Sequence, residues 1–195
     1  MIELQKRFEG MGGEFIISCT DMDKSLDRIK AYVFDWDGVF NAGTKGEGAT
    51  SLFAEADSMG TNLLRFGHWL RTGELPFVAI ITGQYNQSAF QLAQREHFHA
   101  VYFKFHNKPD ALSHIRQNFN IEPSQVAFFF DDALDLSAAA LCGLRFLIRR
   151  PASILFSDYV KEKNLCDYIS AHDGSNYAVR EICELLLTIK GQFTR

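Results

Sequence analysis

The sequence has little cysteine, and its four thiols, Cys19, Cys142, Cys166 and Cys183, show no paired spacing. Without CxxC spacing or the density of a disulfide scaffold, reduced and mostly buried thiols are favoured. Reduced thiols suit the cytoplasm, so we expect a cytoplasmic protein. No apolar run is long enough to span a membrane, and we expect no membrane partner.

An excess of positive charge is also lacking. The 20 lysines and arginines are scattered along the chain, and the formal net charge is −4. A chain without a basic stretch has no field that attracts a polyanion, so nucleic-acid binding is not expected. The sequence shows no repeat or linker, and 195 residues with 47% hydrophobic content suffice for one substantial core.

Apolar runs alternate regularly with segments of helical period. The runs are apolar on both faces, as in the centre of a parallel sheet, and comprise residues 31–34, 77–82, 100–103, 126–130 and 144–148. Helical segments separate them, and a last one covers 177–189. This order predicts an α/β fold with a doubly wound parallel sheet. We expect residues 1–27 to be an N-terminal extension and 28–195 to form the domain.

The residues that follow the strands form the candidate site, because ligands of open α/β sheets bind beyond the carboxyl ends of the strands. These residues are carboxylates, one hydroxyl, one glycine and one lysine: Asp35, Asp37, Thr82, Gly83, Lys108, Asp131 and Asp132. Carboxylates gathered in one crevice repel one another, so either a proton or a cation is needed.

A magnesium ion is the cation that these residues favour. All candidate ligands are hard oxygens, and no histidine or cysteine lies at a strand end, so Mg²⁺ is preferred over Zn²⁺. The spacing of His97, His99, His106 and His114 fits no zinc motif, which makes them surface or packing residues. Carboxylate-bound Mg²⁺ usually accompanies a phosphate group, whose oxygens lysine and hydroxyl donors would hold.

Four stretches in this order resemble the motifs of the haloacid dehalogenase phosphatase superfamily. They are DWDG at 35–38, IITG at 80–83, the lysine of HNKPDAL at 106–112 and FDDALD at 130–135. Over residues 28–190 the chain is similar to the small capless branch typified by 3-deoxy-D-manno-octulosonate 8-phosphate phosphatase. The stretch GSNYAVREICELLL, at 174–187, adds to this similarity.

The resemblance implies a catalytic role for four of these side chains. Asp35 would attack phosphorus and become an aspartyl-phosphate, and Asp37 would protonate the leaving oxygen and then activate water. Thr82 and Lys108 would complete the catalytic set, and together with Gly83 they would bind the phosphate group.

The resemblance also implies a set of metal ligands. Asp35, the backbone carbonyl of Asp37, and Asp131 would hold Mg²⁺. Asp132 would lie close behind them in a supporting role, while Asp135 is expected to orient its loop or cap the following helix.

Some positions depart from the family's pattern. Gln84 and Ala56 stand where relatives often have arginine, so two anion contacts are missing, and we expect neutral sugar phosphates to be preferred over sugar-acid phosphates. Phe130 replaces a small glycine and Trp36 is bulky for its place, so either could narrow the site.

Residues 39–54, VFNAGTKGEGATSLFA, have two short arms around a KGEG turn, which predicts a β-hairpin flap and no large cap. In the family that the chain resembles, hairpins from four subunits pack together. We therefore expect a homotetramer with Leu52 and Phe53 at the interface. The alternative is a free surface hairpin.

These observations favour a Mg²⁺-dependent phosphomonoesterase that acts on a small sugar phosphate or a related phosphorylated metabolite. One alternative is a regulatory module that binds metal and phosphate without turnover. Another is a phosphomutase or dehalogenase on the same scaffold. Asp37 disfavours dehalogenation, and no large cap is evident for a mutase.

Overall fold

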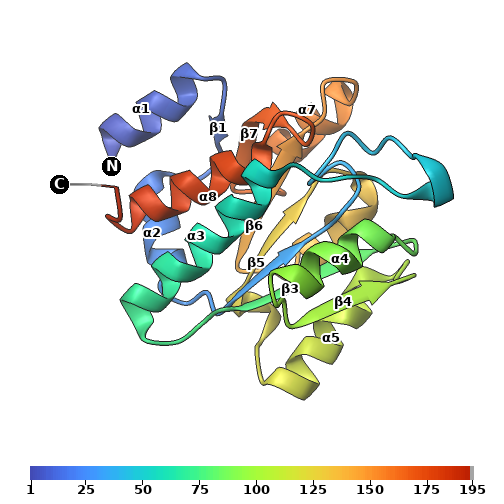
Figure 1. Cartoon of the computed structure of the whole chain (residues 1–195). Helices are drawn as coiled ribbons and strands as arrows, with labels where there is room; N and C mark the ends of the chain where they lie inside the picture. The colour runs from blue at the N-terminus through green and yellow to red at the C-terminus, as the bar shows by residue number, and fades with distance from the viewer. Residues whose placement is uncertain (194–195) are drawn as a thin grey trace.

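The computed structural model describes residues 1–193 and contains a seven-stranded sheet between two layers of helices (Figure 1). The strand order is β1-β7-β6-β5-β2-β3-β4, with β1 antiparallel to β7 and every other pair parallel. The strands are β1 (Glu14–Phe15), β2 (Ala31–Phe34), β3 (Phe77–Thr82), β4 (Ala100–Phe103), β5 (Val126–Phe130), β6 (Leu144–Arg149) and β7 (Tyr168–Asp173). The predicted fold class and all five predicted strands are confirmed.

Helices cover both faces of the sheet. One face carries α1 (Ile2–Gly10), α2 (Cys19–Leu26), α3 (Glu55–Thr72), α4 (Gln87–Arg95) and α8 (Ala178–Ile189). The other carries α5 (Lys108–Phe119), α6 (Leu136–Ala139) and α7 (Ile154–Glu162). Successive residues of β2 alternate between the two cores, with Tyr32 and Phe34 in the first and Val33 in the second. Among the described helices, none is both long and apolar enough to cross a membrane.

The first 27 residues are packed onto the domain. Strand β1 extends the sheet beside β7, and Met22 and Leu26 of α2 are buried in the first core. Phe8 of α1 lies edge-on to Tyr168 of β7, with ring centroids 6.5 Å apart. The division at residue 27 remains a prediction, but these residues share the core of the domain.

The loop after β2 differs from the predicted β-hairpin. Residues 39–54 contain one 3-10 turn, Glu47–Ala49, in place of paired strands, and the part around that turn projects beyond the sheet, in cyan in Figure 1. The backbone N–H of Gly46 donates to the carbonyl of Thr50 at 2.8 Å and closes the tip. The arms do not form a ladder because side chains on either side of the tip turn inward and bind Asp37.

Candidate active site

Side chains from several strand ends line one cavity of about 220 Å³. The lining includes all the predicted site residues: Asp35, Asp37, Thr82, Gly83, Lys108, Asp131, Asp132 and Asp135. The order β5-β2-β3 explains this convergence, because parallel neighbours deliver their carboxyl ends to the same edge of the sheet.

Asp35 is held by the central strand. Its N–H donates to the carbonyl of Phe129 at 2.9 Å, so the ladder between β2 and β5 continues one residue past β2. The chain then turns through Gly38, whose φ is +87°. A side chain there would collide with the Asp131 carboxylate, so glycine fits this turn in both conformation and space.

Three buried carboxylates, those of Asp35, Asp131 and Asp135, place oxygen atoms within 4.8 Å of one another. Burial and the neighbouring Asp135 raise the pKa of Asp35 to about 6. Burial and the charge of Asp35 raise the pKa of Asp131 to about 8, against the opposing effect of Arg150. The cluster therefore resists carrying its full negative charge unless more positive charge is added.

Two basic side chains flank this cluster. Nζ of Lys108 lies 2.7 Å from Oδ1 of Asp35 and is also ion-paired with Asp135. Burial alone would lower the pKa of Lys108, but the two carboxylates raise it above its ordinary value, so the lysine stays charged. On the other side, Nη2 of Arg150 lies 2.5 Å from Oδ2 of Asp131.

The cluster fits a hard divalent cation. Among residues 1–193, the buried Oδ2 of Asp135 has no hydrogen-bond partner, and Oδ2 of Asp131 makes no hydrogen bond despite its ion pair. A buried acceptor without a donor is costly, whereas a cation bound by carboxylate oxygens would satisfy it. Asp35, Asp131 and Asp135 could supply such ligands.

Asp37 lies at the side of the cavity and outside the three-carboxylate cluster. Lys45 forms an ion pair with it, and the hydroxyl of Ser51 donates to its Oδ1 at 2.6 Å. The Ser88 hydroxyl, at the start of α4, donates in turn to the carbonyl of Ser51. Asp37 is thus connected through Ser51 to a helix on the first face of the sheet. Its backbone role toward a metal remains a prediction.

In the motif FDDALD, at 130–135, the roles of Asp132 and Asp135 differ from expectation. Oδ1 of Asp132 accepts from the N–H of Leu134 at 3.2 Å, so Asp132 caps the 3-10 turn that precedes α6. Asp135 makes no side-chain capping bond to α6 and is instead ion-paired with Lys108. The alternative that Asp135 caps the following helix is therefore wrong, because its carboxylate is engaged by Lys108. The alternative that Asp135 orients its loop remains a prediction.

The bulky residues expected to narrow the site point into the cores. Trp36 is fully buried and stacks on Phe40 with centroids 5.1 Å apart. Phe130 stacks on Phe128 in the second core, with centroids 5.8 Å apart. Gln84 does line the cavity and is exposed there. The prediction that Trp36 or Phe130 narrows the site is wrong, since neither side chain faces it.

Several lining or contacting residues escaped the sequence analysis. Arg150 follows β6 directly, so the strand-end rule applied to a fifth strand would have found it. His106, expected to be a surface or packing residue, lines the cavity. Nothing in the sequence pattern indicates that Lys45 and Ser51 contact Asp37, because the path of their loop cannot be inferred from neighbouring residues.

A larger cavity, of about 430 Å³, lies between α1 and α8 and shares no lining residue with the smaller one. Its walls include Arg7, Phe8 and Tyr177. The three-carboxylate cluster lies in the smaller cavity, which is therefore the candidate active site.

Comparison with known proteins gives a consistent result. No protein-family model matches the chain. The 3-deoxy-D-manno-octulosonate 8-phosphate phosphatase KdsC of Escherichia coli K12 is 25% identical over 175 residues, which are 88% of this chain and 86% of the relative. The corresponding phosphatase of Moraxella catarrhalis, solved in complex with magnesium, phosphate and KDO, is 25% identical, with a TM-score of 0.73 over 89% of this chain and 94% of that chain.

A second solved structure shares the fold at lower identity. The cobalt-bound octulosonate 8-phosphate phosphatase of Haemophilus influenzae is 22% identical, with a TM-score of 0.70 over 88% of this chain and 96% of that chain. By its fold, its four ordered motifs and its similarity to these phosphatases, the chain is a phosphoric monoester hydrolase that resembles the haloacid dehalogenase phosphatases.

Proposed function

We propose that the protein is a Mg²⁺-dependent phosphomonoesterase that acts through an aspartyl-phosphate on a small sugar phosphate or related metabolite. The observation that carries this proposal is the convergence of Asp35, Asp37, Thr82, Lys108 and Asp131 on one cavity. Its volume of about 220 Å³ is below the usual range for sites that bind drug-sized ligands, which suits a small phosphorylated substrate.

In the first half of the reaction, the carboxylate of Asp35 attacks phosphorus. The bond between phosphorus and the leaving oxygen breaks, and Asp37 gives that oxygen a proton. Lys108 lies 2.7 Å from Asp35, so its ammonium group can hold a phosphate oxygen while it orients the nucleophile. The hydroxyl of Thr82, buried at the end of β3, is a second donor to the phosphate.

In the second half, Asp37 takes a proton from water, and the resulting hydroxide attacks the phosphorus of the aspartyl-phosphate. The bond between phosphorus and Asp35 breaks, which releases inorganic phosphate, restores the Asp35 carboxylate and leaves Asp37 protonated as at the start. Ser51 and Lys45 hold Asp37 at the cavity wall for both proton transfers.

Asp35 and Asp131, with the backbone carbonyl of Asp37, would hold the Mg²⁺ ion, and Asp135 lies close enough to take part. A bound ion would offset the negative charge of the cluster and of the phosphate oxygens. The magnesium and phosphate in the Moraxella phosphatase structure support this choice of metal.

A phosphate-release screen across sugar, sugar-acid, nucleotide and polyol phosphates, with and without Mg²⁺, tests the function. We expect release only with the divalent cation and complete loss of activity in Asp35→Asn. Asp158→Asn, the same change at an exposed position on α7, is the matched control and should be fully active. Equal hydrolysis in excess chelator, or a fully active Asp35→Asn, would contradict the mechanism. The alternative of a regulatory module is not favoured, because every predicted catalytic side chain lines the cavity.

We also infer a cytoplasmic homotetramer in which the loop of residues 41–54 lies between subunits. Leu52 is 77% exposed in the single chain, and an exposed leucine could be buried in a contact with another subunit. Light scattering should give a tetramer, and replacement of residues 43–50 by a short turn should reduce both assembly and activity. Lys45→Met is the control that separates loss of the Asp37 contact from loss of assembly. A compact, fully active monomer at micromolar concentration would contradict this inference.

A further inference from the structure

Arg150 contacts a carboxylate of the cluster that Lys108 does not pair with. It follows β6 and is partly exposed, yet Nη2 lies 2.5 Å from the buried Oδ2 of Asp131. Nη1 lies 3.8 Å from Oδ2 of Asp132, a more exposed carboxylate. The close approach passes Gly38, where a Cβ atom would meet both the guanidinium and Asp131.

The contact between Arg150 and Asp131 is close but poorly directed. Oδ2 of Asp131 is buried and makes no hydrogen bond within the described part of the chain. The guanidinium therefore lies close to this oxygen without satisfying it as a hydrogen-bond acceptor. This oxygen belongs to the carboxylate that would bind the divalent cation. The guanidinium and a cation would therefore compete for the same buried carboxylate.

We propose that Arg150 is an internal competitor of the divalent cation at Asp131, so that metal binding exchanges one cation for another. The inference rests on the proposed cation site. Three carboxylates face Lys108 and Arg150, and removal of the guanidinium would leave more negative charge for an incoming ion. Asp132 gives the displaced guanidinium a nearby partner, so the exchange needs only a short side-chain movement.

The competition has two consequences that can be measured without any substrate. The affinity for the divalent cation is lower than the carboxylates alone would give, because each binding event breaks an ion pair. Wherever Asp131 is ionised, the cation-free protein is more stable than it would be without Arg150, because the guanidinium offsets a buried charge.

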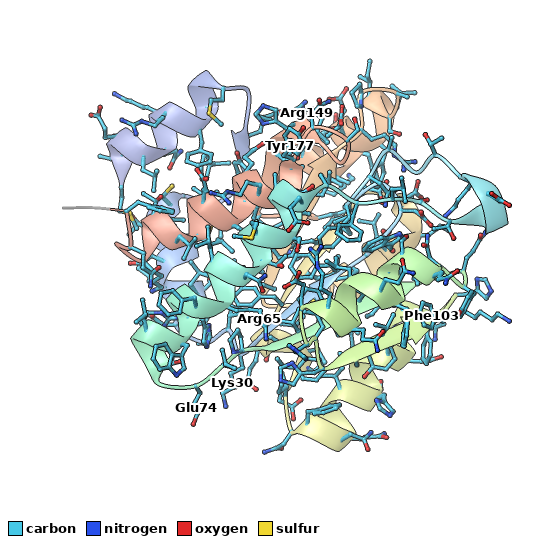
Figure 2. All side chains as sticks on the ribbon, in the orientation of Figure 1. Lys30, Arg65, Glu74, Phe103, Arg149 and Tyr177 are labelled. Atoms are coloured by element: carbon cyan, nitrogen blue, oxygen red, sulfur yellow. The ribbon has the colours of Figure 1, made fainter. Side chains whose placement is uncertain are left out.

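Arg150→Gln tests the proposal, with Arg149→Gln as the matched control. Arg149, labelled in Figure 2, is the adjacent residue, but its guanidinium bonds Glu14 at 2.6 Å and the carbonyl of Gly12 at 3.0 Å, away from the cluster. Both variants lose one positive charge from neighbouring positions. Only the first removes the contact with Asp131.

Calorimetric titration of the chelator-treated protein with MgCl₂ gives the affinity directly. We expect Arg150→Gln to bind Mg²⁺ about tenfold to a hundredfold more tightly than the parent, and Arg149→Gln to stay within about twofold. Arg150→Lys, which keeps the charge but loses the planar fork, should lie between the parent and Arg150→Gln. Thermal melts should show Arg150→Gln less stable without cation and more strongly stabilised by Mg²⁺.

Unchanged or weaker Mg²⁺ binding by both Arg150 variants would overturn the competition. That result would leave the phosphatase proposal intact as long as the parent protein binds Mg²⁺. If the parent binds no divalent cation in the same titration, the proposed cation site itself is wrong, and the inference falls with it.

Discussion

Neutralisation of Asp131 should stabilise the cation-free protein, and more so as the pH rises. In Asp131→Asn an isosteric neutral amide replaces a carboxyl whose pKa burial and Asp35 raise from 3.8 to about 8. The folded chain therefore keeps a proton that the unfolded chain loses above pH about 4. The parent's free energy of unfolding falls between pH about 4 and about 8, because the unfolded state binds fewer protons there. The asparagine variant lacks this loss.

The size of the effect follows from the same shift. At about 1.4 kcal/mol per pKa unit, a shift from 3.8 to about 8 corresponds to about 6 kcal/mol as an upper limit. Asp131 shares this cost with Asp35 and with its ion pair to Arg150, so we expect roughly half, about 3 kcal/mol, at pH 8. In a chain of this length, that difference raises Tm by about 6 to 12 °C.

Thermal melts in excess chelator at pH 5 and pH 8 measure the difference. The Tm advantage of Asp131→Asn should be small at pH 5 and large at pH 8, and added Mg²⁺ should stabilise the parent but not the variant. Asp132→Asn, the same change at the exposed neighbouring carboxylate, should show no such pH dependence. An advantage that is equal at both pH values, or absent at both, would refute the assignment of a buried, charge-coupled carboxyl.

Three further results are expected. Gly38→Ala should lower Tm and weaken Mg²⁺ binding, because the added methyl group strains the site by about 1 to 3 kcal/mol. The control is Gly48→Ala, which is also at positive φ but has no atom near the added Cβ, and thermal melts should show a smaller loss of Tm for it. Ser51→Ala should lower kcat by about tenfold or more with little change in Tm, because it frees the acid/base Asp37, and an unchanged kcat would contradict that positioning role. A neutral sugar phosphate should show a higher kcat/KM than an octulosonate phosphate because Gln84 is uncharged, and the reverse preference would show that another residue supplies the missing charge.

The centre of the fold could be predicted because its strands are buried on both faces. A continuous apolar run such as FVAIIT at 77–82 predicts a buried strand even when its neighbouring strands are unknown. Strand β7 was missed because YISAHD mixes polar and apolar residues and lies near the edge of the sheet, beside the two-residue strand β1. Helices α1 and α2 lie before the first motif, and only tertiary packing shows that they belong to the core.

The candidate site was predictable wherever a side chain ends a central strand or directly follows one. Asp35, Thr82 and Asp131 satisfy that rule. The strand-end rule was not carried as far as Arg150, and Asp135 was given a helix-end role that only the position of Lys108 corrects. The hairpin prediction failed because turn residues indicate a reversal of the chain without fixing what the arms bind. Here they bind Asp37.

The two carboxylates proposed to be catalytic are attached to the molecule in different ways. Asp35 continues the ladder of the central strand, so its position is as rigid as the sheet. Asp37 is steadied by Ser51, which depends on Ser88 at the start of α4. Changes in the loop of residues 41–54 can therefore alter proton transfer to the leaving group while the nucleophile stays in place. Different leaving groups could be accommodated by remodelling that loop alone, with the phosphate-handling half of the site unchanged.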